Sequence, residues 1–300
     1  MVDLRARLGF LNPRRRRWER FLRDLPLDPD RLPRPLPAPT PRDFIICGCP
    51  RTGTTLVAAV LFQPPALVTV MEPWDGMRLS PAALFASLRR ELFETGQVRR
   101  GRLDLPTLLA VGDVRWCQEG RGTVPVEVDP DYLLGVKWPA YWRYLDLLPD
   151  SKFLVCLRDP QEVILSLRDA GGRLAQGLNY DTRFNRPMNL ALQQATGDAG
   201  LRRVLLFEYV HERVLPHLHR PNVFAVRYER WFHDRARLME ELSTFLGRPL
   251  GPGRPAIRQP REHEAPTSRE RILLQRYCRT AEPLGYSWSA ERPDLSGKVR

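Results

Sequence analysis

Residues Asp43–Thr55 read DFIICGCPRTGTT, and this stretch decides the fold of the chain. Its apolar part, Phe44–Cys47, is too short for a helix and suits a buried strand of a parallel sheet. Glycine and proline then break the strand into a tight loop, and a helix is expected to begin at Thr54. Such a loop binds anions, because its backbone N–H groups point inward and the helix dipole adds partial positive charge. The sequence therefore predicts a phosphate, or a chemically similar oxyanion, at this loop.

The two loop glycines, Gly48 and Gly53, have the spacing of the nucleotide-binding P-loop G-x-x-x-x-G-K-[ST], but Thr54 stands where that motif has lysine. A kinase or NTPase uses the lysine on the β- and γ-phosphates and Mg²⁺ for the remaining charge. In this chain the cation lies inside the loop, at Arg51. The alternative interpretation is a tight turn that leads into a core helix. The complete strand–loop–helix context favours the anion site.

A second pattern of interest begins at Arg158, where the expected strand 152–157 ends. An arginine that leaves a strand can hold a phosphate with two parallel N–H bonds. Asp159 suits the N-cap of the following helix and Pro160 its first position. Ser166 offers a hydroxyl group two turns into this helix. The alternative is a helix cap with a surface ion pair.

Pro50–Thr55, which reads PRTGTT, resembles the 5′-phosphosulfate-binding loop of the sulfotransferases that use 3′-phosphoadenosine 5′-phosphosulfate (PAPS). Arg158–Ser166, which reads RDPQEVILS, resembles the 3′-phosphate-binding segment of the same family. The resemblance extends over Arg42–Tyr286 and implies a P-loop-like fold with PAPS as the donor. The residues that it implies for binding the donor are Arg51, Thr52, Gly53, Thr54, Thr55, Arg158 and Ser166.

Two weaker similarities lie further along the chain. Val136–Tyr141, which reads VKWPAY, looks like the Lys-x-Pro-x-Tyr segment of carbohydrate sulfotransferases, whose lysine lies near the transferred group. Val226–Glu229, with the helix up to Phe245–Gly247, is similar to a C-terminal segment that is widespread in the family. A sulfuryl group carries less negative charge than a γ-phosphoryl group, so fixed donors and one or two cations can stabilise its transfer without a metal. The sequence has no cluster of Asp, Glu and His with metal-ligand spacing.

A base must take the proton from the acceptor, and the family uses either histidine or glutamate for this step. Cytosolic-type members carry the histidine directly after the strand lysine, where this chain has Trp138 and Pro139. Glu72 follows the expected strand 67–71, at the place where the glutamate-type carbohydrate and bacterial members have their base. The catalytic residues that the resemblance implies are Glu72, Arg51 and Lys137.

Alternatives to Glu72 as the base stay open at this point. An ordinary capping or ion-paired role also fits Glu72, and Asp75 and Glu127 are rival bases. Pro73 is expected to bias Glu72 towards an extended backbone. The five histidines lie late in the chain and are expected on surface or helix faces, except for His263 in a loop.

Composition narrows the class of ligand. The formal net charge is +12, and all but three of the 47 basic residues are arginines. The arginines are scattered apart from Arg14–Arg17, and no zinc-finger or RNP-type motif accompanies them, so small anions are favoured over nucleic acid. The five cysteines have an odd count and scattered spacing, which predicts free, buried thiols. The chain has no run of 18 apolar residues and no leader pattern, so a cytoplasmic location without a membrane span is expected.

The pattern of apolar runs predicts one α/β domain over 42–300, preceded by an Arg/Pro-rich arm over 1–41. Strands alternating with helices predict a mostly parallel sheet with helices on both faces and ligands at the carboxyl ends of the strands. Residues 75–130 are expected to form a helical insertion and 171–189 a loop. The expected strands are 44–47, 67–71, 132–138, 152–157 and 222–226, and the expected helices 54–62, 81–93, 105–119, 140–148, 161–168, 191–218, 235–246 and 268–284.

Together these patterns predict a PAPS-dependent sulfotransferase that acts on a hydroxyl or amine of a small-molecule or carbohydrate acceptor. A P-loop kinase of small molecules is the alternative enzyme, and a non-catalytic nucleotide-binding protein is the alternative of another class. Lysine is missing at Thr54 and the Arg158–Ser166 motif is present, which disfavours the kinase. The sequence does not identify the acceptor or the oligomeric state.

Overall fold

A parallel sheet is the centre of the computed structural model, which describes residues 36–99, 123–179, 185–251, 257 and 263–287. Its five strands have the order β2-β5-β1-β6-β7. The strands are β1 (Asp43–Gly48), β2 (Leu67–Met71), β5 (Leu133–Lys137), β6 (Lys152–Leu157) and β7 (Val223–Arg227). Every pairing between them is parallel. The predicted α/β class with a mostly parallel sheet is thereby confirmed.

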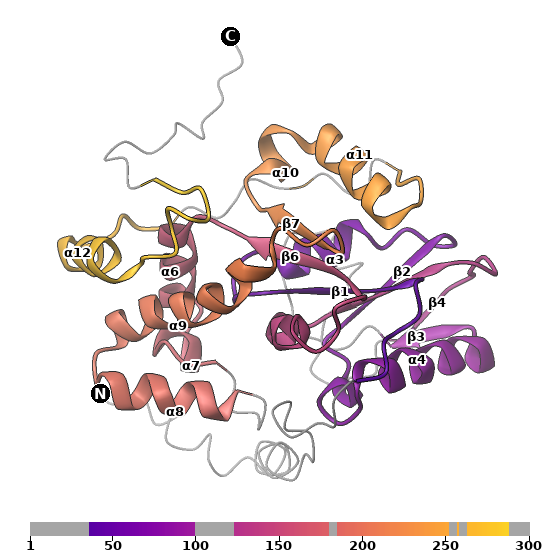
Figure 1. The fold of residues 1–300 in the computed structure, drawn as a ribbon, viewed down its shortest axis with the longest axis horizontal. Coiled ribbons are helices and arrows are strands. Elements are labelled where there is room, and N and C mark those ends of the chain that lie inside the picture. Colours follow the sequence, from indigo (N-terminus) through magenta and orange to yellow (C-terminus); the bar gives the residue numbers. More distant parts are fainter. Residues whose placement is uncertain (1–35, 100–122, 180–184, 252–256, 258–262, 288–300) are drawn as a thin grey trace, which may run out of the picture.

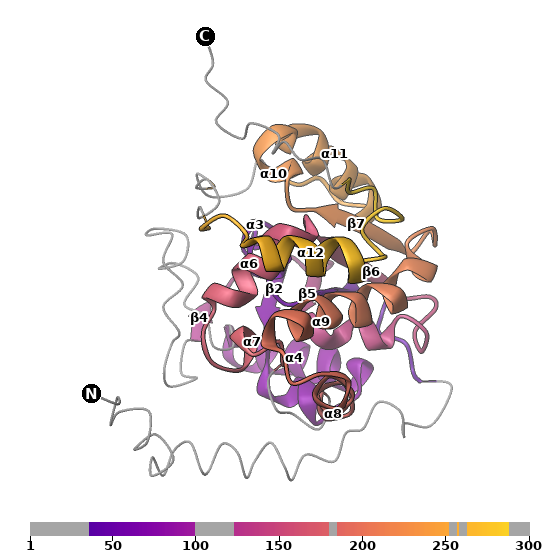
Figure 2. The ribbon, with the colours of Figure 1, turned by 90° about the vertical axis from the view of Figure 1, so that its left-hand side faces the viewer.

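Helices cover both faces of the sheet, because successive strand residues point to opposite sides. In β1, Phe44 and Ile46 belong to one buried cluster, and Ile45 and Cys47 belong to the other. The Phe44 side is covered by α3 (Thr54–Val60), α10 (Arg230–His233) and α11 (Arg235–Leu246). The Ile45 side is covered by α4 (Pro81–Thr95), α6 (Pro160–Asp169), α7 (Gly172–Ala175), α8 (Arg186–Ala195), α9 (Ala199–Val214) and α12 (Ser268–Tyr277) (Figures 1 and 2).

The cysteines of the described ranges are free and buried, as predicted. Cys47 and Cys156 lie in neighbouring strands, Cys49 lies in the loop after β1, and burial raises the pKa of each of these thiols. Cys117, the expected helix 105–119 and most of the N-terminal arm lie outside the described residues. None of the helices in the described part of the chain has the length and apolar character needed to cross a membrane.

The insertion 75–130 was predicted to be helical, and this is only partly correct. After the 3₁₀ helix η3 (Trp74–Met77) and α4, the chain forms a small antiparallel sheet of β3 (Gln97–Arg99) and β4 (Thr123–Pro125). Gly96 ends α4 in the left-handed conformation, with φ of 62°, and Val98 after it is buried. The glycine therefore redirects the chain from a helix into a strand.

Other differences concern where helices begin and end. Residues 171–189, predicted as a loop, contain α7 and the start of α8. The helix expected over 191–218 is interrupted before Asp198, whose carboxylate accepts the N–H of Gly200 and begins α9. The expected helix 140–148 is the shorter 3₁₀ helix η4 (Pro139–Tyr144). The last helix, α12, ends at Tyr277 instead of residue 284.

Gly135 in β5 leaves room for the Phe44 ring of the neighbouring strand β1. It pairs with Phe44, and a β-carbon at Gly135 would lie 2.4 Å from the Phe44 ring. We expect Gly135→Ala to lower the free energy of unfolding by about 1–3 kcal/mol, the usual cost of overpacking a core. Chemical denaturation of Gly135→Ala, Phe44→Leu and the double variant measures the loss in the free energy of unfolding for each protein. The double variant should lose less than the two single losses together, and additive losses would contradict this packing.

His211 lies on a helix, which is one of the two expected settings, and it belongs to the buried face of α9. Its Nδ1 lies 2.8 Å from the carbonyl oxygen of Phe207, and its Nε2 is buried without a hydrogen-bond partner in the described ranges. Burial lowers the pKa of His211 to about 4. The folded protein therefore holds this imidazole neutral at pH 7.

This pKa makes stability depend on pH. The unfolded chain binds a proton at His211 near pH 6.5 and the folded chain near pH 4, so stability falls as the pH is lowered through this window. The loss between pH 7 and pH 5 is about 2 kcal/mol. Relative to wild type, His211→Gln should gain that amount over the same interval in denaturation experiments. A difference between the two proteins that does not change with pH would refute this assignment.

Candidate functional site

The predicted site residues meet at one edge of the sheet, because parallel strands all end on the same side. Lys137 at the end of β5 pairs with Met71 at the end of β2 and with Ile46 in β1. Gly48 at the end of β1 pairs with Cys156 near the end of β6. The loop after β1, Glu72, Lys137 and Arg158 therefore leave the sheet side by side.

The loop after β1 is a tight turn that packs against β6. Thr52 donates from its backbone N–H and its hydroxyl to the carbonyl oxygen of Cys49, at 3.3 and 2.7 Å. A β-carbon at Gly48 would lie 2.6 Å from the carbonyl oxygen of Cys156. Arg51 has a positive φ of 76°, and its side chain is exposed. The hydroxyl of Thr52 thus stabilises the turn, and Arg51 projects from it.

Gly53, which precedes α3, is needed for two reasons. Its φ is 92°, in the left-handed region that favours glycine, and a β-carbon there would lie 2.4 Å from the Tyr228 ring. Thr54 directly after it is buried and Thr55 is half-buried at the start of α3. The Tyr228 ring therefore lies against the loop, and burial raises the pKa of its hydroxyl.

The two predicted phosphate-binding motifs are in direct contact, although they lie 115 residues apart in the chain. Arg51 donates from Nε to the hydroxyl of Ser166 in α6 at 2.9 Å. Arg158 donates to the carbonyl oxygen of Arg51 at 3.3 Å and forms an ion pair with Glu162, also at 3.3 Å. Its guanidinium lies 4.4 Å from the centre of the Tyr228 ring. The loop, the start of α6 and the residue after β7 therefore come together around Arg51 and Arg158.

Arg158 has an unused donor at this site. Its side chain is buried, and its Nε has no hydrogen-bond partner among the residues that the structure describes. A buried donor without a partner costs free energy, and an anion that accepts from it relieves that cost. Arg51, Ser166 and Arg158 therefore bring together side-chain donors that an anionic ligand could use.

Glu72 and Lys137 form a short ion pair at the same edge. Lys137 Nζ lies 2.5 Å from Glu72 Oε1, and the Lys137 side chain is only 3% exposed. Glu72 Oε2 accepts no hydrogen bond from any described residue. The extended backbone expected for Glu72 is wrong, because its φ is 45°. Its N–H donates to the carbonyl oxygen of Lys137, and the backbone then turns sharply into η3.

Asp75 and Glu127, the two rivals of Glu72 as the base, lie in different parts of the structure. Glu127 precedes β5, and nearby Asp129 donates its N–H to the carbonyl oxygen of Pro65, which precedes β2. Glu127 therefore lies near the amino edge of the sheet, opposite the loop. Asp75 is exposed in the first turn of η3, three residues after Glu72. Asp75 stays near the site, whereas Glu127 does not.

Sequence reasoning did not assign Tyr228, Glu162 or Glu229 to the site. Tyr228 contacts the loop and Arg158, and Glu162 pairs with Arg158. Glu229 accepts the N–H of Asp159 at 2.7 Å. The available signal was the position of Tyr228 and Glu229 directly after a strand, but only the sheet order shows that β7 lies next to β6.

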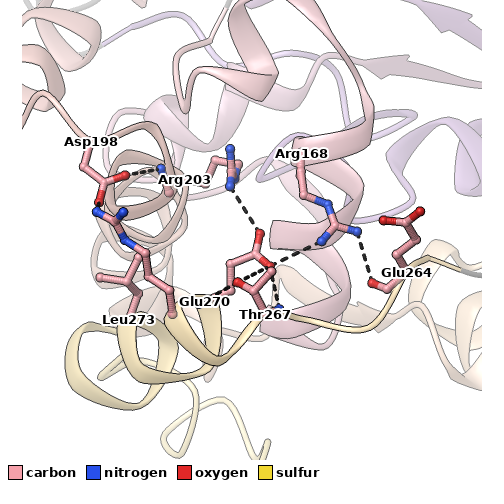
Figure 3. A pocket seen from close by; sticks show the side chains of 9 residues that line it. Arg168, Asp198, Arg203, Glu264, Thr267, Glu270 and Leu273 are labelled. Carbon is pink, nitrogen blue, oxygen red and sulfur yellow. Dashed lines mark hydrogen bonds and ion pairs between the residues drawn. The ribbon is translucent and has the colours of Figure 1, made fainter.

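A polar hollow lies between α6, α9 and α12, and none of the predicted site residues lines it (Figure 3). Its side chains mostly pair with one another. Glu270 binds Arg168 and Arg203, both at 3.3 Å, and Asp198 pairs with Arg269. Glu270 also completes the capping box of α12 with Thr267. This cluster attaches α12 to the two helices beside it.

The chain has low similarity to several solved structures. One of them is a sulfotransferase domain from the curacin biosynthetic pathway, with 20% sequence identity and a TM-score of 0.39. The alignment covers 72% of this chain and 76% of that domain. A sulfotransferase from Alicyclobacillus acidocaldarius shows 17% identity, with 83% and 95% covered and a TM-score of 0.40. Mouse sulfotransferase SULT7A1 complexed with PAP shows 16% identity, with 70% and 61% covered and a TM-score of 0.33. A search of curated proteins gave no significant match.

The sequence itself matches the model of the sulfotransferase family over residues 43–252. The matched segment begins at the first residue of β1 and includes the loop, Glu72, Lys137, the Arg158–Ser166 motif and the end of β7. Because the match covers well over half of the sequence, this chain belongs to the sulfotransferase family.

Proposed function

We propose that this sulfotransferase transfers a sulfuryl group from PAPS to a hydroxyl or amine group of a small-molecule or carbohydrate acceptor. The observation that supports this most is the contact of Arg51 with Ser166, because it joins the two phosphate-binding motifs into one site. A donor with a 5′-phosphosulfate and a 3′-phosphate needs two neighbouring anion sites of this kind. Thr54, in place of the P-loop lysine, favours sulfuryl transfer over phosphoryl transfer.

The proposed donor contacts follow from the side chains present. The 5′-phosphosulfate would be held by Arg51 and by the backbone N–H groups around Gly53, Thr54 and Thr55. The 3′-phosphate would be held by Arg158 and Ser166. The donor supplies an activated sulfuryl group, and the chain orients it and provides positive charge where negative charge develops.

Glu72 is the proposed base and Lys137 its positioning partner. Lys137 holds Glu72 Oε1 at 2.5 Å, which leaves Oε2 to accept the proton of an acceptor hydroxyl or amine. The buried ammonium of Lys137 also places a positive charge beside the reacting groups, where it stabilises negative charge in the transition state. The left-handed backbone of Glu72 is consistent with a functional constraint, since strain of this kind gathers at active sites.

Two assays test the proposed function directly. Labelled PAPS with a panel of alcohol, sugar and amine acceptors should give labelled product. A thermal-shift comparison should show stabilisation by adenosine 3′,5′-bisphosphate that ATP with Mg²⁺ does not match. Preferential stabilisation by ATP with Mg²⁺ would favour a kinase. Binding of the bisphosphate without turnover of any acceptor would favour a non-catalytic nucleotide-binding protein.

Glu72→Gln keeps the shape of the side chain and removes its basicity. We expect turnover to fall by about 10²–10⁴-fold, the usual contribution of a general base, with donor affinity nearly unchanged. Steady-state kinetics and calorimetry with adenosine 3′,5′-bisphosphate measure the two effects. Asp75→Asn is the matched control and should keep turnover. If Glu72→Gln turns over normally and Asp75→Asn does not, Asp75 is the base.

Arg158→Ala should weaken binding of adenosine 3′,5′-bisphosphate by about 1.5–3 kcal/mol, since it removes a charge-assisted hydrogen-bonding group. Binding of adenosine 5′-phosphate, which lacks the 3′-phosphate, should change much less. Calorimetry with both nucleotides gives the comparison, and Arg213→Ala, at an exposed position in α9, is the control. Equal losses for the two nucleotides would remove the assignment of Arg158 to the 3′-phosphate.

A further inference from the structure

The residues that follow β7 contact both halves of the candidate donor site. Tyr228 donates its backbone N–H to the carbonyl oxygen of Leu157 at 2.8 Å, which extends the pairing of β7 with β6 beyond the strand ends. Its ring lies against Gly53 on one side and carries the Arg158 guanidinium on its face. The next residue, Glu229, accepts the backbone N–H of Asp159 at 2.7 Å. One dipeptide thus contacts the loop and the junction of β6 with α6.

The chain after α12 contacts this dipeptide and the residue that precedes it. Tyr286 donates its hydroxyl to Glu229 Oε2 at 3.3 Å. Arg227 donates to the carbonyl oxygen of Leu284 at 2.5 Å, and its guanidinium lies 5.1 Å from the centre of the Tyr286 ring. Gly285, with φ of 79°, turns the chain beside Arg227. Both carboxylate oxygens of Glu229 therefore have a donor, one from Asp159, the N-cap of α6, and one from the C-terminal segment 278–286.

The hydrogen bond from the N–H of Asp159 to the Glu229 carboxylate constrains the backbone next to Arg158. Asp159 is the N-cap of α6, and its side chain accepts the N–H of Glu162. Its own N–H lies outside the helix, so the helix cannot provide an acceptor for it. Glu229 supplies this acceptor and fixes the peptide that joins Arg158 to Asp159. The remaining polar contacts of Arg158, to Arg51 and Glu162, are both 3.3 Å long and do not involve its Nε.

We propose that Glu229 and Tyr286 are positioning residues that aim Arg158 at the 3′-phosphate of the donor. In this arrangement the C-terminal segment 278–286 sets how well the enzyme distinguishes nucleotides with a 3′-phosphate from those without one. The inference rests on the proposed function, because it uses the assignment of Arg158 to that phosphate. It adds residues that the phosphate-binding motifs do not contain.

Three variants separate positioning from general stability. Glu229→Met removes the acceptor and keeps a side chain of similar length, Glu229→Gln keeps a carbonyl acceptor, and Tyr286→Phe removes only the hydroxyl. We expect Glu229→Met to lower affinity for adenosine 3′,5′-bisphosphate roughly tenfold, with less than a twofold change for adenosine 5′-phosphate. Glu229→Gln should recover most of the loss. Tyr286→Phe should lose about two- to fivefold, and the control Tyr277→Phe, on α12, should lose nothing.

Calorimetry with the two nucleotides gives the ratio of affinities, which a merely structural role does not change. Equal weakening for both nucleotides, or an unchanged ratio in Glu229→Met, would overturn the proposal. Hydrogen exchange of the ligand-free protein provides a second measurement, which does not depend on the donor. The amide of Asp159 should exchange faster in Glu229→Met than in wild type or Glu229→Gln, and equal exchange would also overturn it.

The same measurements distinguish this inference from the proposed function. If wild type binds both nucleotides equally, or neither of them, the assignment of the donor fails. Faster exchange at Asp159 in Glu229→Met would then still establish that Glu229 fixes this peptide, but the proposed role in 3′-phosphate recognition would be refuted together with the donor. If wild type distinguishes the nucleotides and all variants do so equally well, only the positioning role fails.

Discussion

The place of β1 in the middle of the sheet is the constraint on which the candidate site depends. β1 pairs with β5 on one side and β6 on the other, and all three strands run in the same direction. The strand is buried on both faces, so a slip of one residue would exchange the side chains of the two cores. The core therefore fixes the register, and the register fixes where the loop lies relative to Lys137 and Arg158.

Two residues at this edge have backbones that ordinary side chains rarely adopt. Arg51 and Glu72 are the non-glycine residues with positive φ in the described part of the chain, and both closely follow a strand. Such conformations cost about 1–3 kcal/mol each and persist only where their surroundings impose them. The Lys137 ammonium donates to the Glu72 carboxylate, and the backbone N–H of Glu72 donates to the carbonyl oxygen of Lys137. The hydroxyl of Ser166 accepts a hydrogen bond from Arg51 Nε. These contacts orient both side chains.

Burial of cations is the second property that organises the site. Lys137 and Arg158 are both buried, and a buried cation is costly unless it has partners. Glu72 partners Lys137, whereas Arg158 divides its contacts among Glu162, a backbone carbonyl group and the face of Tyr228. Arg158 keeps one buried donor, Nε, without a partner in the described ranges. Lys137 thus has its partner within the chain, whereas Arg158 keeps a donor that an anionic ligand could use.

Features that depend on neighbours along the chain could be predicted from the amino-acid sequence. The loop, the strand runs, the N-cap at Asp159 and the two anion-binding motifs are local patterns, so the parallel sheet and its site edge followed from them. The folded chain was needed to see three further features: the contact of Arg51 with Ser166, the distance of Glu127 from the site, and the contacts of Tyr228 and Glu229. It also reversed the expected backbone of Glu72, because the bonds to Lys137 outweigh the local preference before Pro73. These features depend on the order and register of strands distant in sequence, which no local pattern records.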